Sequence, residues 1–182
     1  AIGRGNVVEV LAAVKQNAKN LNEADAQGNT ALMLAAQAGK AEMVSLLIKN
    51  KAQLDIQNKK GQTALVLAID HQQLEAAELL IQAGANVLLA DTNELSPLKL
   101  AIAINNPALI QSLGNKAAAK NLTPVQEFDL MAVCISLGQA QALDALLKIG
   151  LNPKTVTPEK MTLLMVIPMG YMSQKKRLLQ EK

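Results

Sequence analysis

The sequence predicts an all-α solenoid of stacked helix–turn–helix units, and three observations support this prediction. The motif Thr-Ala-Leu occurs at residues 30–32 and 63–65, and Ser-Pro-Leu follows at 96–98, so that the interval is 33 residues each time. The surroundings repeat as well, because Leu-Leu-Ile at 46–48 recurs at 79–81. Hydrophobic residues make up 50% of the chain but aromatic residues only 1%, which suits close packing of helices through small side chains. A fixed period of this length is typical of an array of like units.

The same interval divides all 182 residues into one continuous array without a second domain. A degraded copy of the motif stands at 129–131, and a recovered copy, Thr-Leu-Leu, stands at 162–164. We therefore expect a partial first repeat at 1–24, then repeats at 25–57, 58–90, 91–123 and 124–156, and a terminal cap at 157–182.

The first repeats predict pairs of short helices. Apolar residues at helical spacing between Val7 and Val14 indicate the second helix of an incomplete unit. In the next repeat, Thr30 is a good N-cap, and Gly39 suits the left-handed conformation that ends the first helix. A second helix is expected from about Glu42 to Lys49.

The third and fourth repeats depart from this pattern at turns. Gln72 stands where the previous repeat has Gly39, and it tolerates a positive φ less well than glycine does. Asn105 suits the same left-handed site in the following repeat. Glu94 occupies the place of the glycine in the loop before the first helix.

The last repeats predict longer first helices. Thr123, Pro124 and Gln126 form a capping box with proline in the first turn, about five residues before the aligned motif. The loop at 115–121 lacks the alternating apolar residues of a strand, so we expect it to be remodelled. Cys134 aligns with core alanines and is expected to be a small buried residue rather than a nucleophile.

These features resemble the ankyrin-repeat family. The best-kept stretch is residues 25–39, and Gln-Ala-Gly-Ala-Asn-Val at 82–87 supplies the ending of a repeat. The resemblance implies β-hairpin fingers between the helix pairs, with irregular last two repeats. The family's Thr-Pro-Leu-His box lacks its histidine here, because the fourth position is Met33, Val66 or Lys99. The inter-repeat hydrogen bonds of that histidine are therefore expected to be missing.

Composition argues against several classes of function. The net charge is only +3, and neither 59–60 nor 175–177 is a basic cluster interleaved with aromatic residues, so nucleic acid is not an expected partner. No apolar run reaches the length of a membrane span. The one His and one Cys lie far apart in the array, and no metal-ligand spacing occurs, so we expect no catalytic residue, no metal and no cofactor.

The resemblance implies a non-enzymatic protein-binding module with a concave face. We expect a protein partner, most simply an enzyme that the chain covers and inhibits, and a monomer when unbound. Ankyrin self-protection proteins of predatory bacteria, which block cell-wall peptidases, suggest such a partner. The alternative is a scaffold or host-directed effector that binds without inhibiting. We expect a periplasmic protein if Ala1 follows a removed signal peptide, and a cytoplasmic one otherwise.

Candidate partner-binding residues come from alignment with the family and from one local cluster. The cluster, around Met161, either fills the terminal core or forms an adaptable apolar patch. The candidates are the finger residues Lys59, Lys60, Thr92, Asn93 and Leu95, the first-helix residues Met33, Asp70 and Lys99, and the cluster residues Met165, Met169, Tyr171 and Met172.

Overall fold

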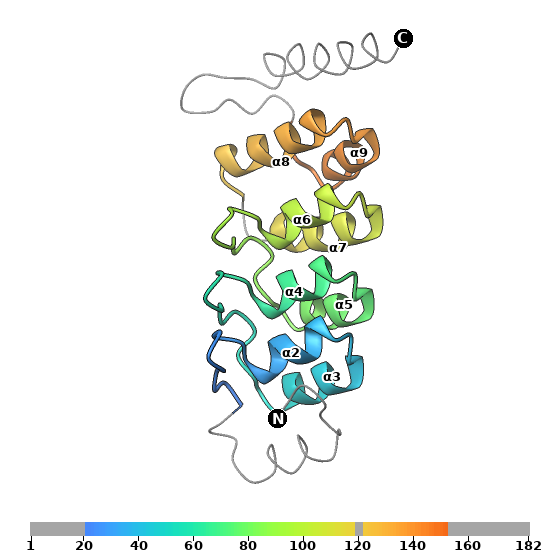
Figure 1. Cartoon of the computed structure of the whole chain (residues 1–182). Coiled ribbons are helices and arrows are strands. Elements are labelled where there is room, and N and C mark those ends of the chain that lie inside the picture. The colour runs from blue at the N-terminus through green and yellow to red at the C-terminus, as the bar shows by residue number, and fades with distance from the viewer. Residues whose placement is uncertain (1–20, 119–121, 153–182) are drawn as a thin grey trace, which may run out of the picture. The chain divides into compact units, whose positions relative to one another are not determined.

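The computed structural model describes residues 21–118 and 122–152 (Figure 1). The chain divides into two compact units, Ala1–Leu100 and Ala101–Lys182, which we describe separately. The helices in the described residues are α2 (Ala31–Gln37), α3 (Ala41–Lys49), α4 (Ala64–Asp70), α5 (Leu74–Gln82), α6 (Pro97–Ala103), α7 (Pro107–Ala118), α8 (Pro124–Ser136) and α9 (Ala140–Lys148). None of these helices is long and apolar enough to cross a membrane.

The first unit is a stack of helix pairs in register with the 33-residue period. First helices pack on first helices and second helices on second helices, α2 against α4 and α3 against α5 (Figure 1). Thr30 and Thr63 cap α2 and α4 by accepting hydrogen bonds from the N–H groups of Met33 and Val66, at 3.4 and 3.3 Å. The predicted helix starts are therefore confirmed.

Small and aliphatic side chains fill the core of this unit. Ala36, Ala68 and Ala77 are fully buried, and they let the helices approach closely. Leu47 and Leu80 lie at equivalent places of α3 and α5 and are fully buried too. The low aromatic content of the sequence is thus matched by close helix packing.

The turns inside the helix pairs share one backbone conformation. Gly39, Gln72, Asn105 and Gly138 all have positive φ, at 65°, 56°, 52° and 68°. The predicted left-handed position is therefore confirmed at both non-glycine residues. For Gln72 this conformation brings its Cβ close to a carbonyl oxygen, which costs about 1 kcal/mol.

The second unit has longer helices and a different junction. The capping box at Thr123 is present, and α8 has 13 residues where α2 and α4 have 7 each. α7 continues to Ala118, so helix replaces the first part of the loop expected at 115–121, and α8 begins at Pro124, within the segment that aligns with a finger. The remodelled loop and the lengthened first helix are both confirmed. Cys134 is buried in this unit, as its alignment with core alanines predicts.

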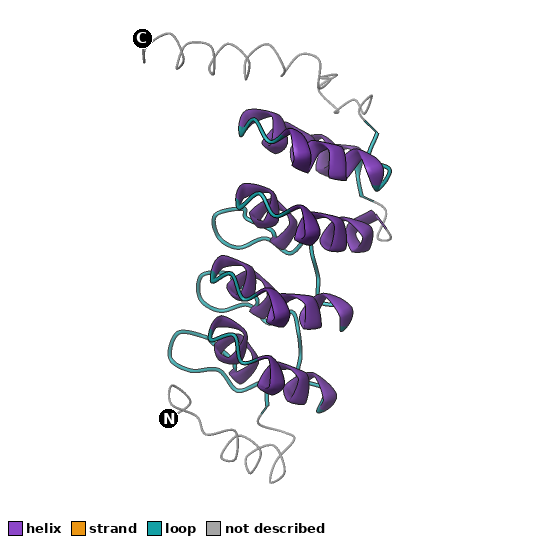
Figure 2. Ribbon diagram, turned by 90° about the vertical axis from the view of Figure 1, so that its right-hand side faces the viewer, coloured by secondary structure: helices purple, strands orange, loops and turns teal. Residues whose placement is uncertain are grey.

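The fingers of the first unit are tight turns. In the described residues only an isolated bridge between Ala24 and Thr30 has strand pairing, so the expected β-hairpins are corrected to turns. Figure 2 shows the loops leaving this unit's helix pairs on one side. The partial repeat before residue 21 and the cap at 157–182 lie outside the described residues.

Candidate protein-binding surface

Three fingers, residues 24–30, 57–63 and 90–96, make up the candidate surface. Each is organised by a side chain at its second residue, Asp25, Asn58 or Asp91, whose Oδ1 accepts two backbone hydrogen bonds from the same turn. The donors are the N–H groups of Gln27 and Asn29 at 2.9 and 2.8 Å, of Lys60 and Gln62 at 3.0 and 2.9 Å, and of Asn93 and Leu95 at 2.8 and 3.0 Å. This internal bonding gives the three turns a common shape.

Hydrogen bonds within the first finger lower the pKa of the Asp25 carboxyl group. The N–H of Asn29, followed by weaker contributions from the Asn29 side chain and the N–H groups of Gln27 and Gly28, holds the pKa of Asp25 below its ordinary value of 3.8. Hydrogen bonds to an ionised carboxylate favour the charged form. The Asp25 carboxylate is therefore ionised in the folded chain near neutral pH.

Neighbouring fingers are in direct backbone contact. Lys59 donates its N–H to the carbonyl of Gln27 at 3.1 Å, and Thr92 donates both its N–H and its Oγ1 to the carbonyl of Lys60, at 3.1 and 3.0 Å. A Cβ on Gly61 would lie 2.9 Å from the backbone nitrogen of Thr92. The approach of the third finger therefore requires glycine at this position as well as a positive φ.

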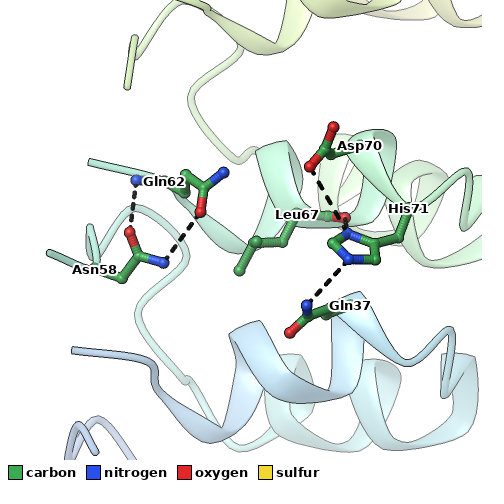
Figure 3. A network of polar contacts seen from close by, with 6 residues as sticks. All are labelled: Gln37, Asn58, Gln62, Leu67, Asp70 and His71. Carbon is green, nitrogen blue, oxygen red and sulfur yellow. Dashed lines mark hydrogen bonds and ion pairs between the residues drawn. The ribbon is translucent and has the colours of Figure 1, made fainter. Parts of the chain in front are cut away.

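Side chains add further links between repeats. Asn58 donates its Nδ2 to Oδ1 of Asn29 at 2.9 Å. The same Nδ2 lies 3.4 Å from Oε1 of Gln62 (Figure 3). One further side-chain-to-backbone hydrogen bond occurs twice, at positions 33 residues apart. Asn22 accepts the N–H of Gln53 at 2.9 Å, and Asp55 accepts the N–H of Asn86 at 2.7 Å.

His71 joins two repeats at the other end of the first helices. Its Nδ1 lies 3.0 Å from the carbonyl of Leu67, so this nitrogen carries the proton, and Nε2 accepts from the amide of Gln37 at 3.1 Å (Figure 3). Asp70 lies 4.0 Å from Nδ1 and is solvent-exposed. Inter-repeat hydrogen bonds are therefore present, although the residues that make them are not the histidine of the usual box.

The structure brings together all five predicted finger residues. Lys59, Lys60, Thr92 and Asn93 are exposed, and Leu95 is 38% exposed beside them in the third finger. These five residues belong to two turns that the Thr92–Lys60 bonds hold together. We call them the finger patch.

The predicted first-helix residues do not join the finger patch. Met33 is only 1% exposed and forms part of the core, so the expectation that it faces a partner is corrected. Asp70 is exposed but lies at the far end of α4, roughly 10 Å along the helix from the finger, given 1.5 Å per residue. Lys99 is half-buried in α6. Met161, Met165, Met169, Tyr171 and Met172 lie outside the described residues.

Two groups of residues were missed by the sequence interpretation. Asp25, Asn58 and Asp91 recur every 33 residues with side chains that can accept hydrogen bonds, and this regularity was a visible signal of their role. The contact between Gln37 and His71 left no comparable signal, because the equivalent residues in the next pair, Asp70 and Ile104, cannot repeat it.

Comparison with known proteins agrees with this geometry. The family model of ankyrin repeats, in three copies, matches residues 1–91. A chain from the structure of the predatory endopeptidase Bd0816 of Bdellovibrio bacteriovorus in complex with immunity protein Bd3460 is similar to this chain. It has 28% sequence identity and a TM-score of 0.69, and the match covers 100% of this chain and 95% of that one.

A second solved structure is similar at lower identity. The ankyrin-repeat domain of Bcl-3, a member of the IkappaB protein family, has 22% identity and a TM-score of 0.72, and the match covers 88% of this chain and 72% of that one. The comparison with curated proteins gives no match. The likeness to the Bcl-3 domain concerns the fold alone.

Proposed function

The chain belongs to the ankyrin-repeat family, whose repeats are protein-binding modules, and from this premise we propose that it covers and inhibits a partner enzyme. The proposed partner is a cell-wall peptidase, and the proposed role is protection of the producing cell. Such a complex would form in the periplasm, where the wall is accessible.

The observation that carries this proposal is the exposed row of three fingers with a fixed backbone. Each turn is closed by its own Asp or Asn side chain, and each is bonded to the next turn. A surface whose backbone is already ordered loses little conformational entropy on binding. Fingers held in this way suit tight, stoichiometric covering of another protein.

The similarity to the endopeptidase complex supports the inhibitory part of the proposal. We take the matched chain to be the immunity protein of that complex, because the described residues of this chain form pairs of helices, and the likeness extends over the full length of this chain. A likeness confined to one or two repeats would support the proposal much less, because the same fold is used to bind many unrelated partners.

The chemistry of the described residues also favours binding over catalysis. Burial raises the pKa of the Cys134 thiol to about 11, which is the wrong direction for a nucleophile. The ring of His71 is bonded on both nitrogens, to Leu67 and Gln37. No cluster of three His, Cys, Asp or Glu residues that could hold a metal occurs in residues 21–118 and 122–152.

A peptidase titration tests the proposal. The folded chain is added to cell-wall endopeptidases of the producing organism, and to Bd0816 as a first probe, while peptidoglycan hydrolysis is followed. We expect hydrolysis to stop at about one chain per enzyme if the dissociation constant is nanomolar. The ankyrin domain of Bcl-3 is a matched control for the fold, and it should leave hydrolysis unchanged. Binding with full remaining activity would instead indicate a scaffold or effector.

A further inference from the structure

We propose that the finger patch docks an acidic segment of the partner, in which carboxylates flank an apolar side chain. This inference rests on the proposed function and deepens it, because it states the chemistry of the partner's contact segment. Lys59 and Lys60 would bind the carboxylates, and Leu95 would contact the apolar side chain.

The two lysines are available for a partner. Both are exposed, and within the described ranges neither forms an ion pair, whereas Lys148 and Asp144 pair at 2.7 Å. Asp91 forms no ion pair with either lysine in the described part of the chain, and its Oδ1 accepts the N–H groups of Asn93 and Leu95. The ammonium groups therefore remain free to meet carboxylates from outside.

The backbone beneath the lysines is fixed on both sides. Lys59 donates its N–H to the first finger, at the carbonyl of Gln27, and Lys60 donates its N–H to Asn58. The carbonyl of Lys60 accepts two hydrogen bonds from Thr92 in the third finger. Only the lysine side chains must be ordered when a partner binds, which limits the entropy loss.

Leu95 supplies an apolar contact where the other fingers have amides. Its equivalents are Asn29 and Gln62, which are half-buried and lie within hydrogen-bond distance of Asn58. Leu95 cannot make such a bond, and its side chain is 38% exposed. A single exposed leucine is ordinary on a protein surface, but this one stands in the turn that Thr92 bonds to Lys60. Apolar and cationic groups thus adjoin in one patch.

The surrounding charge favours an acidic protein segment over nucleic acid. Residues 21–100 carry six lysines against nine aspartates and glutamates, a net charge of −3. The acidic Glu94 stands on the third finger, and Glu23 immediately precedes the first finger. An extended phosphate backbone would be repelled there, whereas a short segment with one or two carboxylates would reach the lysines alone.

A selection from random peptides tests the docking surface directly. Random dodecapeptides displayed on phage are selected on the folded full chain, and the affinity of the enriched peptides is measured by fluorescence anisotropy. We expect enriched peptides to carry Asp or Glu next to an aliphatic or aromatic residue. The double variant Lys59→Glu/Lys60→Glu should weaken them about tenfold or more, since like charges then face each other.

Matched variants separate the patch from general charge effects. Lys40→Glu/Lys49→Glu makes the same charge change at exposed positions outside the finger patch and should change the affinity by less than about twofold. Leu95→Asn introduces the residue found in the first finger and should weaken binding about tenfold. Circular dichroism should show unchanged helix content for each variant.

Two results would overturn the inference. One is a selection without acidic enrichment, and the other is a set of acidic peptides that bind the Lys59→Glu/Lys60→Glu variant as tightly as the wild type. Either result leaves the proposed function standing if the chain still inhibits a peptidase. Failure of inhibition with intact acidic-peptide binding would contradict the proposed function and support the docking surface.

Discussion

Asn58 donates its Nδ2 to Oδ1 of Asn29, 2.9 Å away, and thereby bonds the second finger to the first. The same side chain closes its own turn through Oδ1, which accepts the N–H groups of Lys60 and Gln62. Asn58 therefore both links two fingers and closes its own turn. Asp25 and Asp91, the equivalent residues of the other two fingers, can only close their turns, because an ionised carboxylate does not donate a hydrogen bond.

Two substitutions at Asn58 separate these tasks. Asn58→Asp keeps the acceptor that closes the turn and loses the donor to Asn29, so we expect it to lower the free energy of unfolding by less than about 1 kcal/mol. Asn58→Ala removes both and should lower it by about 1–3 kcal/mol, because two turn N–H groups lose their acceptor. Urea denaturation measures both values. Equal losses would show that turn closure contributes nothing.

Gly61 should tolerate alanine less well than Gly84 does. Both have positive φ, at 71° and 94°, so alanine strains the backbone at either position by about 1 kcal/mol. A Cβ at Gly61 would also meet the backbone of Asp91 and Thr92 at 2.9–3.1 Å, whereas a Cβ at Gly84 would meet nothing within 4 Å. We expect Gly61→Ala to cost about 1–3 kcal/mol more than Gly84→Ala in thermal or urea unfolding. A difference near zero would mean that the fingers separate easily.

Gln72→Gly should stabilise the protein. Gln72 has a φ of 56°, and Gly39 and Gly138 occupy the equivalent turn with similar values. Glycine relieves the strain of the Cβ, and we expect a gain of about 0.5–1 kcal/mol in the free energy of unfolding. Gln72→Ala is the control: it retains the Cβ and should give no gain. The interpretation of this turn is wrong if glycine destabilises the chain.

Cys134 should react slowly with thiol reagents in the folded chain. Burial raises the pKa of its thiol from 9.0 to about 11, so the thiolate at pH 8 is about 100-fold scarcer than in the unfolded chain. Because the unfolded thiol ionises first, folding should also become less favourable as the pH rises from about 9 towards 11. It is the only cysteine, so labelling reports on this site alone. A folded chain that reacts as fast as the denatured one would contradict its burial.

The sequence predicted the fold well because the repeat carries its signals locally. Helix starts at Thr30, Thr63 and Thr123 follow from single-residue capping preferences that tertiary contacts do not reverse. The left-handed turn at Gln72 follows from its alignment with Gly39 and runs against the preference of glutamine itself. Glu94 stands at the position of Gly28 and Gly61, where a Cβ would meet the backbone of the next finger, but the sequence interpretation drew no conclusion from it. The sequence equivalent to a fourth finger is helical from Pro124 onward.

The candidate surface was predicted only in part. Met33 was predicted to face a partner by alignment with the family, but its side chain is buried in the core. Exposure at this position depends on packing between α2 and its neighbours, which residue type alone does not give. The bond between Gln37 and His71 likewise depends on the spacing of two stacked repeats.

Inhibition of a cell-wall endopeptidase by the folded chain is the most direct test of the proposed function. Peptidoglycan hydrolysis is measured while the chain is added from below to above equimolar amounts. We expect the rate to fall in proportion to the added chain and to vanish near one equivalent, as tight binding requires. Undiminished hydrolysis by every cell-wall endopeptidase of the producing organism at a chain concentration of roughly 10 μM would contradict the proposal, because even a micromolar dissociation constant would then leave most of the enzyme occupied.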